Sequence, residues 1–143
     1  HGYPRDLHSF PTRRASDLKT GNVRIIADGL LFYEGITPWQ ALILIYLITV
    51  LFTELITNNA AAVLMFPVAM AVADQLGVSY MPFIIAIMFA ASASFITPLG
   101  YQTNLMVYGP GGYRFTDYAR LGIPLSITVA VVSLFLIPQI WHF

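Results

Sequence analysis

The chain has 143 residues, of which 57% are hydrophobic and only 10% charged, and its seven basic residues balance its seven acidic ones. Soluble domains average roughly 25% charged residues, so this composition excludes an ordinary soluble domain and favours an integral membrane protein. The zero net charge gives no reason to expect a nucleic-acid partner. The absence of cysteine from the sequence excludes disulfides, thiol catalysis and cysteine metal sites.

The first 18 residues differ in character from the rest of the chain. Residues 8–18 read HSFPTRRASDL, a polar and basic stretch without periodicity. This stretch resembles a translated sequencing-adapter read. We therefore expect residues 1–18 to be a disordered or artefactual leader without a functional role, and the natural protein to continue upstream.

Two helical segments follow the leader. Residues 19–35 combine apolar and charged residues with a helical period, which predicts an amphipathic helix. Residues 38–75 hold two apolar runs, 39–55 and 60–73, separated by a polar stretch. A helix needs about 20 apolar residues to cross a bilayer, so the first run is marginal and the second too short. We expect a re-entrant helical hairpin over 38–75, with its polar tip buried in protein or facing a water-filled cavity.

The C-terminal half predicts two further membrane segments. Residues 81–96 are apolar and rich in small residues, which suits close helix packing in lipid. A polar break over 97–104 and a short apolar restart predict one transmembrane helix over 81–109 that is broken near its middle. Residues 120–141 are uninterrupted and predict a final transmembrane helix. The expected fold class is therefore an all-α integral membrane protein.

The two polar breaks carry the chemistry that the sequence offers. A helix that restarts at membrane depth presents free backbone N–H groups, with a partial positive charge of about half a unit, to an anion. Unwound carbonyl groups do the reverse and coordinate cations. Thr57, Asn58 and Asn59 occupy the N-cap region of the helix over 60–73. Thr103 and Asn104 stand in the same way before Leu105.

Threonine hydroxyls, asparagine carbonyls and the backbone carbonyls of Ile56 or Gly100 supply oxygen atoms at the breaks. Such oxygen ligands suit a hard cation such as sodium. A simpler alternative is that single Asn and Thr residues only join neighbouring helices by hydrogen bonds. Glu54 is a carboxylate at membrane depth and hence a candidate for function. It is a candidate ligand, and equally a candidate for a residue that only caps or bridges the hairpin.

The polar tip and the broken helix resemble those of the divalent-anion/sodium symporter family, which carries dicarboxylates and sulfate. Members have two inverted repeats, each with a re-entrant hairpin ending in Ser-Asn-Thr and a broken helix whose loop closes on Asn. Thr53-Glu-Leu-Ile-Thr-Asn-Asn59 is similar to the second hairpin tip, and Thr97-Pro-Leu-Gly-Tyr-Gln-Thr-Asn104 to the second broken helix. The resemblance covers residues 19–143 and implies the second inverted repeat of a secondary transporter.

The resemblance also implies functional residues. It places one sodium ion at Thr53, the Ile56 carbonyl, Asn58 and the Gly100 carbonyl. It places the substrate at the hairpin tip and beside the broken helix, with contacts from Thr57, Asn58, Asn59, Gln102, Thr103 and Asn104. The tip reads Thr57-Asn-Asn59 and the loop Gln102-Thr-Asn104, where dicarboxylate carriers usually show Ser-Asn-Thr and often Pro-Pro-Asn. In these two motifs the chain is more similar to the bacterial sulfate-type branch. The resemblance therefore favours sulfate or a related oxyanion over a C4-dicarboxylate as the substrate.

The sequence thus predicts a transport-domain fragment over 19–143 of a multi-pass protein of the bacterial inner membrane. It would contribute half of a site for a divalent anion and a co-transported sodium ion. Its expected partners are the lipid bilayer, the missing N-terminal repeat of the same protein and a second copy in a homodimer. The alternatives are an arsenite-type or sodium/proton antiporter, a non-transporting membrane anchor and an inactive truncated fragment. No enzyme motif occurs.

Overall fold

The computed structural model describes residue 29 and residues 35–143. Its helices are α3 (Pro38–Leu55), α4 (Asn58–Leu76), α5 (Met81–Ser92), α6 (Gln102–Tyr108) and α7 (Phe115–Ile140), and no strand occurs among the described residues. The expected all-α fold is therefore confirmed for this part of the chain. The predicted leader and nearly all of the predicted amphipathic helix lie outside the described residues.

Local sequence signals set the ends of the first two helices. At the start of α3, Thr37 and Gln40 form a capping box, in which each side chain accepts a hydrogen bond from the backbone N–H of the other. The Thr57 hydroxyl caps α4 by accepting from the Ala60 N–H at 3.4 Å. At the other end of α4, Gly77 adopts a φ of 64°, the left-handed conformation that commonly terminates helices.

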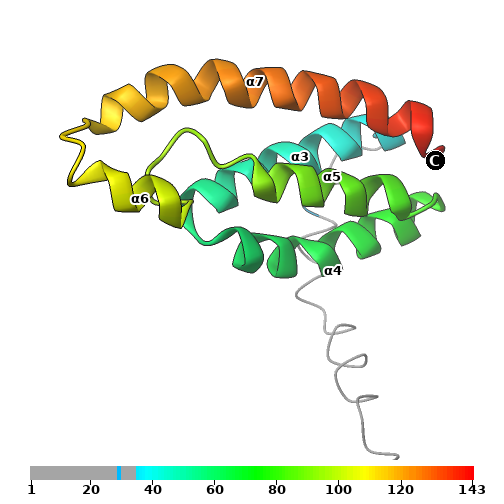
Figure 1. Ribbon diagram of the computed structural model, residues 1–143. Helices are drawn as coiled ribbons and strands as arrows, with labels where there is room; N and C mark the ends of the chain where they lie inside the picture. Colours follow the sequence, from blue (N-terminus) through cyan, green and yellow to red (C-terminus); the bar gives the residue numbers. More distant parts are fainter. Residues whose placement is uncertain (1–28, 30–34) are drawn as a thin grey trace, which may run out of the picture.

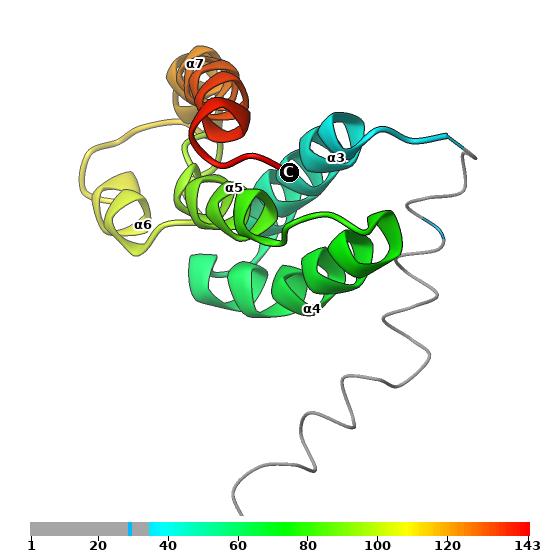
Figure 2. The same ribbon diagram turned by 90° about the vertical axis from the view of Figure 1, so that its right-hand side faces the viewer.

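Helix α5 lies at the centre of the bundle (Figures 1 and 2). It packs against α3, α4 and α7, while α3 also contacts α4 and α7. Figure 1 shows α6 at the end of the bundle where α5 ends, and a loop leads from α6 to the start of α7. The two helices of the hairpin, α3 and α4, thus both pack against one central helix.

The core is built from one apolar face of each of α3, α4 and α5. Its largest fully buried side chains include Tyr46, Phe83 and Leu42. Many of the other buried core residues are alanines, and Ala69 and Ala86 are fully buried. Because alanine side chains allow helix axes to approach closely, this composition suits helix association in lipid, where tight packing is a main source of stability.

The outer faces of the helices are apolar. Val63 on α4 is 75% exposed, Leu121 on α7 is 76% exposed and Phe135 on α7 is 66% exposed. Within the described residues, α3, α4 and α7 are long and apolar enough to cross a membrane. An apolar surface of this extent is unfavourable in water and favourable in a bilayer or against other membrane helices.

Helix α4 is longer than the apolar run that predicted it. The run covers residues 60–73, and the helix extends at both ends to 19 residues. The expectation that this segment is too short to cross a membrane is therefore wrong, because polar residues at its ends are also helical. The re-entrant path of the α3–α4 hairpin remains a prediction.

The break in the second apolar segment also differs in position from the predicted one. We expected apolar helix as far as Ile96 and a restart at Leu105. In the structure α5 ends at Ser92, and the chain is without regular helix until α6 begins at Gln102. The final helix α7 begins at Phe115, five residues before the predicted start. Beyond the end of α5, the backbone N–H groups of Ile96 and Thr97 donate to Glu54 of α3 instead of to helical carbonyls.

Candidate functional site: a polar cluster at the meeting point of broken helices

Four oxygen-bearing groups converge where α3 ends, α4 begins and the chain leaves α5. They are the Thr53 hydroxyl, the Asn58 amide and the backbone carbonyls of Ala91 and Gly100, together called the tip cluster below. Thr53 Oγ1 lies 2.8 Å from the Ala91 carbonyl oxygen and 2.8 Å from the Asn58 amide. The Asn58 amide lies 3.2 Å from the Ala91 oxygen and 3.0 Å from the Gly100 oxygen.

Helix ends explain why these carbonyls are available. The last four carbonyl groups of an α-helix have no partner within the helix. Ala91 lies in the last turn of α5, and its carbonyl accepts from the Thr53 hydroxyl. Thr53 lies in the last turn of α3, and its own carbonyl accepts from the Ser94 hydroxyl at 3.3 Å. A side chain of α3 thus satisfies an end carbonyl of α5, and Ser94, just beyond α5, satisfies an end carbonyl of α3.

The Asn58 amide has two orientations with different chemistry. With its nitrogen facing the cluster, the NH2 group donates to Thr53 Oγ1 and the Gly100 carbonyl, while Thr53 donates to Ala91, so every group is satisfied. With its oxygen facing the cluster, the four groups present only oxygen acceptors and one hydroxyl hydrogen. The second arrangement is a set of neutral oxygen ligands of the kind that hard cations prefer.

The cluster is closely packed. Thr53 is fully buried, and Gly100 has no space for a side chain. A Cβ atom at Gly100 would collide with the Ser94 hydroxyl and with the carbonyl oxygen of Thr53. A glycine is therefore required here, because it allows the backbone of the unwound segment to approach the end of α3.

Glu54 lies beside the cluster and is also buried, with 6% of its surface exposed. Its two carboxylate oxygens accept hydrogen bonds from consecutive backbone N–H groups, Ile96 at 3.0 Å and Thr97 at 2.8 Å. These bonds join the end of α3 to the segment between α5 and α6, and the ligand role of Glu54 stays a prediction.

The structure brings together part of the predicted sodium set. Thr53, Asn58 and Gly100 share the tip cluster, whereas Ile56 terminates α3 in an extended conformation and takes no part in the cluster's hydrogen bonds. Sequence reasoning missed the Ala91 carbonyl and Ser94. Both lie in a run of small residues that indicated only close packing, and their role depends on where α5 ends.

The predicted substrate residues lie at the two helix starts. Thr57 and Asn59 flank Asn58 and are exposed, as are Gln102 and Thr103 in the first turn of α6. The prediction that Thr103 and Asn104 precede this helix as its cap is wrong: α6 begins at Gln102, its N-cap is Tyr101, and no side chain caps it. The cluster's hydrogen bonds involve none of the three polar residues of α6.

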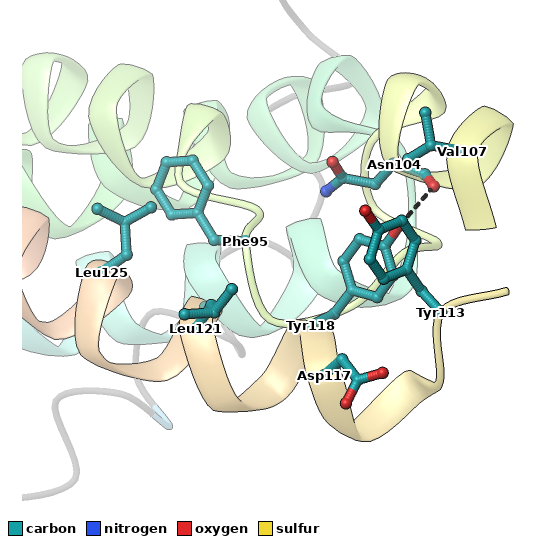
Figure 3. A pocket seen from close by; sticks show the side chains of 9 residues that line it. Phe95, Asn104, Val107, Tyr113, Asp117, Tyr118, Leu121 and Leu125 are labelled. Atoms are coloured by element: carbon teal, nitrogen blue, oxygen red, sulfur yellow. Dashed lines mark hydrogen bonds between the residues drawn. The ribbon is translucent and has the colours of Figure 1, made fainter. Parts of the chain in front are cut away.

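Asn104 instead lines a pocket of about 380 Å³ between α6 and α7. The Tyr118 hydroxyl donates to the Asn104 backbone carbonyl at 3.1 Å, and the rings of Tyr108 and Tyr113 pack around Tyr118. Figure 3 shows the amide of Asn104 on the same side of the pocket as the two tyrosines 113 and 118, with Phe95, Leu121 and Leu125 on the other side. These contacts hold α6 against the start of α7.

The chain is similar in sequence to several proteins that are named as transporters. Over 106 residues the chain is 49% identical to an uncharacterized transporter of Synechocystis, covering 74% of the chain and 17% of that protein. It is 39% identical over 126 residues to the uncharacterized transporter YfbS of Escherichia coli, covering 87% and 21%. It is 42% identical over 104 residues to sodium/sulfate cotransporter 1 of Chlamydomonas reinhardtii, covering 71% and 12%.

The apolar helices indicate a multi-pass membrane protein. The family match places the chain in the transporter class rather than among enzymes. The chain belongs to the citrate transporter family, CitMHS, whose model matches residues 18–142. It spans only 12% to 21% of the length of the three relatives described above.

Proposed function

We propose that this chain is the second-repeat part of a sodium-coupled symporter for a divalent anion, and that it contributes half of the substrate and sodium site. The observation that carries the proposal is the convergence of Thr53, Asn58 and the Ala91 and Gly100 carbonyls on one small volume. The relatives named as sodium/sulfate cotransporters support sodium as the coupled ion.

The tip cluster is suited to sodium because its ligands carry no formal charge. Neutral oxygens hold a monovalent cation without the strong attraction that carboxylates exert on divalent ions. In this proposal the Asn58 oxygen faces the ion when it is bound, and the Asn58 nitrogen replaces it when the ion leaves. The Ala91 carbonyl is added to the sodium ligands that the family resemblance implied, and Ile56 keeps its predicted place there only as a proposal.

The substrate would lie on the exposed side of the same helix starts. Thr57 and Asn59 at the start of α4, with Gln102 and Thr103 at the start of α6, present hydroxyl and amide groups beside free backbone N–H groups. Asn58 connects this side with the tip cluster, so that ion and anion share one residue. The other repeat of the full-length protein would supply the remaining contacts, in a homodimer in a bacterial inner membrane.

Sulfate and carboxylates are both candidate substrates. The names of several relatives favour sulfate, and the description of the family favours citrate. Both are oxyanions that accept hydrogen bonds from N–H and hydroxyl groups, so the site geometry is compatible with either.

The test is uptake of labelled sulfate, succinate and citrate by the full-length transporter that carries this segment, reconstituted in proteoliposomes with and without an inward sodium gradient. We expect uptake of one anion to require the gradient. A sodium/proton antiporter would instead move protons when a sodium gradient is imposed and would take up none of the anions. Uptake that is independent of sodium would contradict the coupling.

A further inference from the structure

Glu54 occupies an unusual position for a carboxylate. It is the penultimate residue of α3, where the partial negative charge at the helix C-terminus disfavours another negative charge. It is also buried, which raises the cost of its charge further. A glutamate at this position therefore does not stabilise α3. Its hydrogen-bond partners must offset the cost of burying its charge.

Those partners are backbone N–H groups of the segment that interrupts the broken helix. Carboxylate Oε1 accepts from Ile96 at 3.0 Å and Oε2 from Thr97 at 2.8 Å. Both donors belong to residues between α5 and α6, where no helical carbonyl is available to accept from them. Glu54 thus takes the place of the missing helical acceptors at two consecutive residues.

Thr97 completes a second link in the opposite direction. Its hydroxyl donates to the Glu54 backbone carbonyl at 2.9 Å, and its hydroxyl oxygen accepts from the Gly100 N–H at 3.4 Å. On the far side of the segment, Gly122 of α7 lies so close to the Phe95 carbonyl that a side chain there would collide with it. The unwound segment is therefore fixed between α3 and α7.

Gly100 connects this arrangement to the tip cluster. Its N–H is held by Thr97, and its carbonyl oxygen lies 3.0 Å from the Asn58 amide. A chain of hydrogen bonds thus runs from Glu54 through Thr97 to a carbonyl of the proposed sodium site. Glu54 does not need to touch the ion to influence it.

We propose that Glu54 is a positioning residue that sets the sodium affinity of the tip cluster by holding the unwound segment, and with it the Gly100 carbonyl, against the end of α3. This inference rests on the proposed function for its effect on sodium. The hydrogen bonds of Glu54 to Ile96 and Thr97 are testable without any transport activity.

The first variant is Glu54→Gln in the full-length transporter. Glutamine keeps the size of the side chain but replaces one acceptor oxygen by an NH2 group, which cannot accept from a backbone N–H. We expect the half-saturating sodium concentration for anion uptake to rise about tenfold or more, as for other lost hydrogen bonds to charged groups. The maximal rate at saturating sodium should change by less than about threefold, because the groups that contact the substrate remain. Asp74→Asn is the control, since it makes the same chemical change at an exposed carboxylate on α4.

Thr97 provides an independent pair of variants, which decides the question if Glu54→Gln does not fold. Thr97→Val removes the hydroxyl and should raise the half-saturating sodium concentration, as Glu54→Gln does. Thr97→Ser keeps the hydroxyl and should behave like the wild type. A similar rise in the half-saturating sodium concentration in both variants would contradict a role for the Thr97 hydroxyl and would overturn the proposal.

Hydrogen–deuterium exchange at single-residue resolution tests the contacts themselves. The Ile96 and Thr97 amides should exchange about tenfold or more faster in Glu54→Gln than in wild type or Asp74→Asn. Unchanged exchange together with an unchanged sodium half-saturation would disprove the inference. If the wild type shows no sodium-dependent uptake, the proposed function fails, and the exchange rates still decide whether Glu54 holds the segment.

Discussion

Backbone carbonyl oxygens provide half of the tip cluster, and they are available because helices end there. Ala91 lies in the last turn of α5, and Gly100 lies in the unwound segment just before α6. The cluster therefore depends on how closely the backbone of this segment approaches α3. That approach is possible only because residue 100 carries no side chain.

Gly100→Ala tests this dependence. The added Cβ would collide with the Thr53 carbonyl, a backbone atom that cannot move without shifting the end of α3. We expect sodium-dependent anion uptake to fall by about tenfold or more, since misplacing a binding group by about 1 Å can have effects of that size. Initial uptake rates at limiting sodium measure the effect.

Gly109→Ala is the matched control for that variant. Gly109 follows α6, and a Cβ atom added to it would meet no other atom within 4 Å. Its φ of −70° is one that any residue adopts. The variant should retain uptake close to that of the wild type. Equal activity in both alanine variants would show that the close approach at Gly100 does not matter for transport.

At the scale of whole elements, α7 holds the unwound segment from the side opposite α3. Gly122→Ala would place a methyl group against the Phe95 carbonyl and the Ile96 backbone. Because overpacking of a closely packed contact costs about 1–3 kcal/mol, we expect a lower melting temperature in detergent or nanodiscs. Thermal unfolding of this variant beside Gly109→Ala measures the difference, and equal stabilities would contradict the packing described.

The path of the α3–α4 hairpin gives a second prediction for an element. This chain contains no cysteine, so in the full-length transporter, with any cysteine outside it replaced, a spin label at Asn59→Cys reports on one position. A re-entrant hairpin places this exposed residue near the middle of the bilayer, with water access through the site. Electron paramagnetic resonance with oxygen and a water-soluble nickel complex measures the depth. A label at headgroup depth would show that α3 and α4 both cross the membrane.

Element existence could be predicted from sequence more readily than element ends. The apolar runs identified α3, α4, α5 and α7, and the Thr57 cap was visible from residue type and position. The end of α5 at Ser92 was not, because the next residues are as apolar as those before them. The Ile96 and Thr97 N–H groups, which a continuing helix would have bonded internally, donate instead to Glu54, which lies 42 residues earlier than Ile96 in the chain.

Some residues of the candidate site could be predicted from the sequence and others could not. Thr53, Asn58 and Gly100 could be proposed from residue type and a family resemblance, because their side chains or position in a polar break are visible in the sequence. The Ala91 carbonyl and the Ser94 hydroxyl could not, since any residue has a carbonyl and Ser94 is one of several small residues. Their role follows only from the tertiary contact between α3 and α5.

The described helices leave large apolar faces uncovered. Apolar side chains cover the outer faces of α4, α6 and α7, including Val63, Met106 and Phe135. The three relatives compared above are several times longer than this chain. In our account the remainder of the transporter covers part of these faces and completes the anion site, while lipid covers the rest.

Binding of the coupled sodium ion by the tip cluster is tested by the sodium dependence of anion uptake in Asn58→Ala. The substitution removes the one side chain that joins Thr53, Ala91 and Gly100. Thr128→Val is the control, because the Thr128 hydroxyl only bonds the Pro124 carbonyl within α7. We predict that Asn58→Ala loses sodium-dependent uptake while Thr128→Val retains it. Sodium-dependent uptake with unchanged half-saturation in Asn58→Ala would show that the tip cluster does not bind the coupled ion.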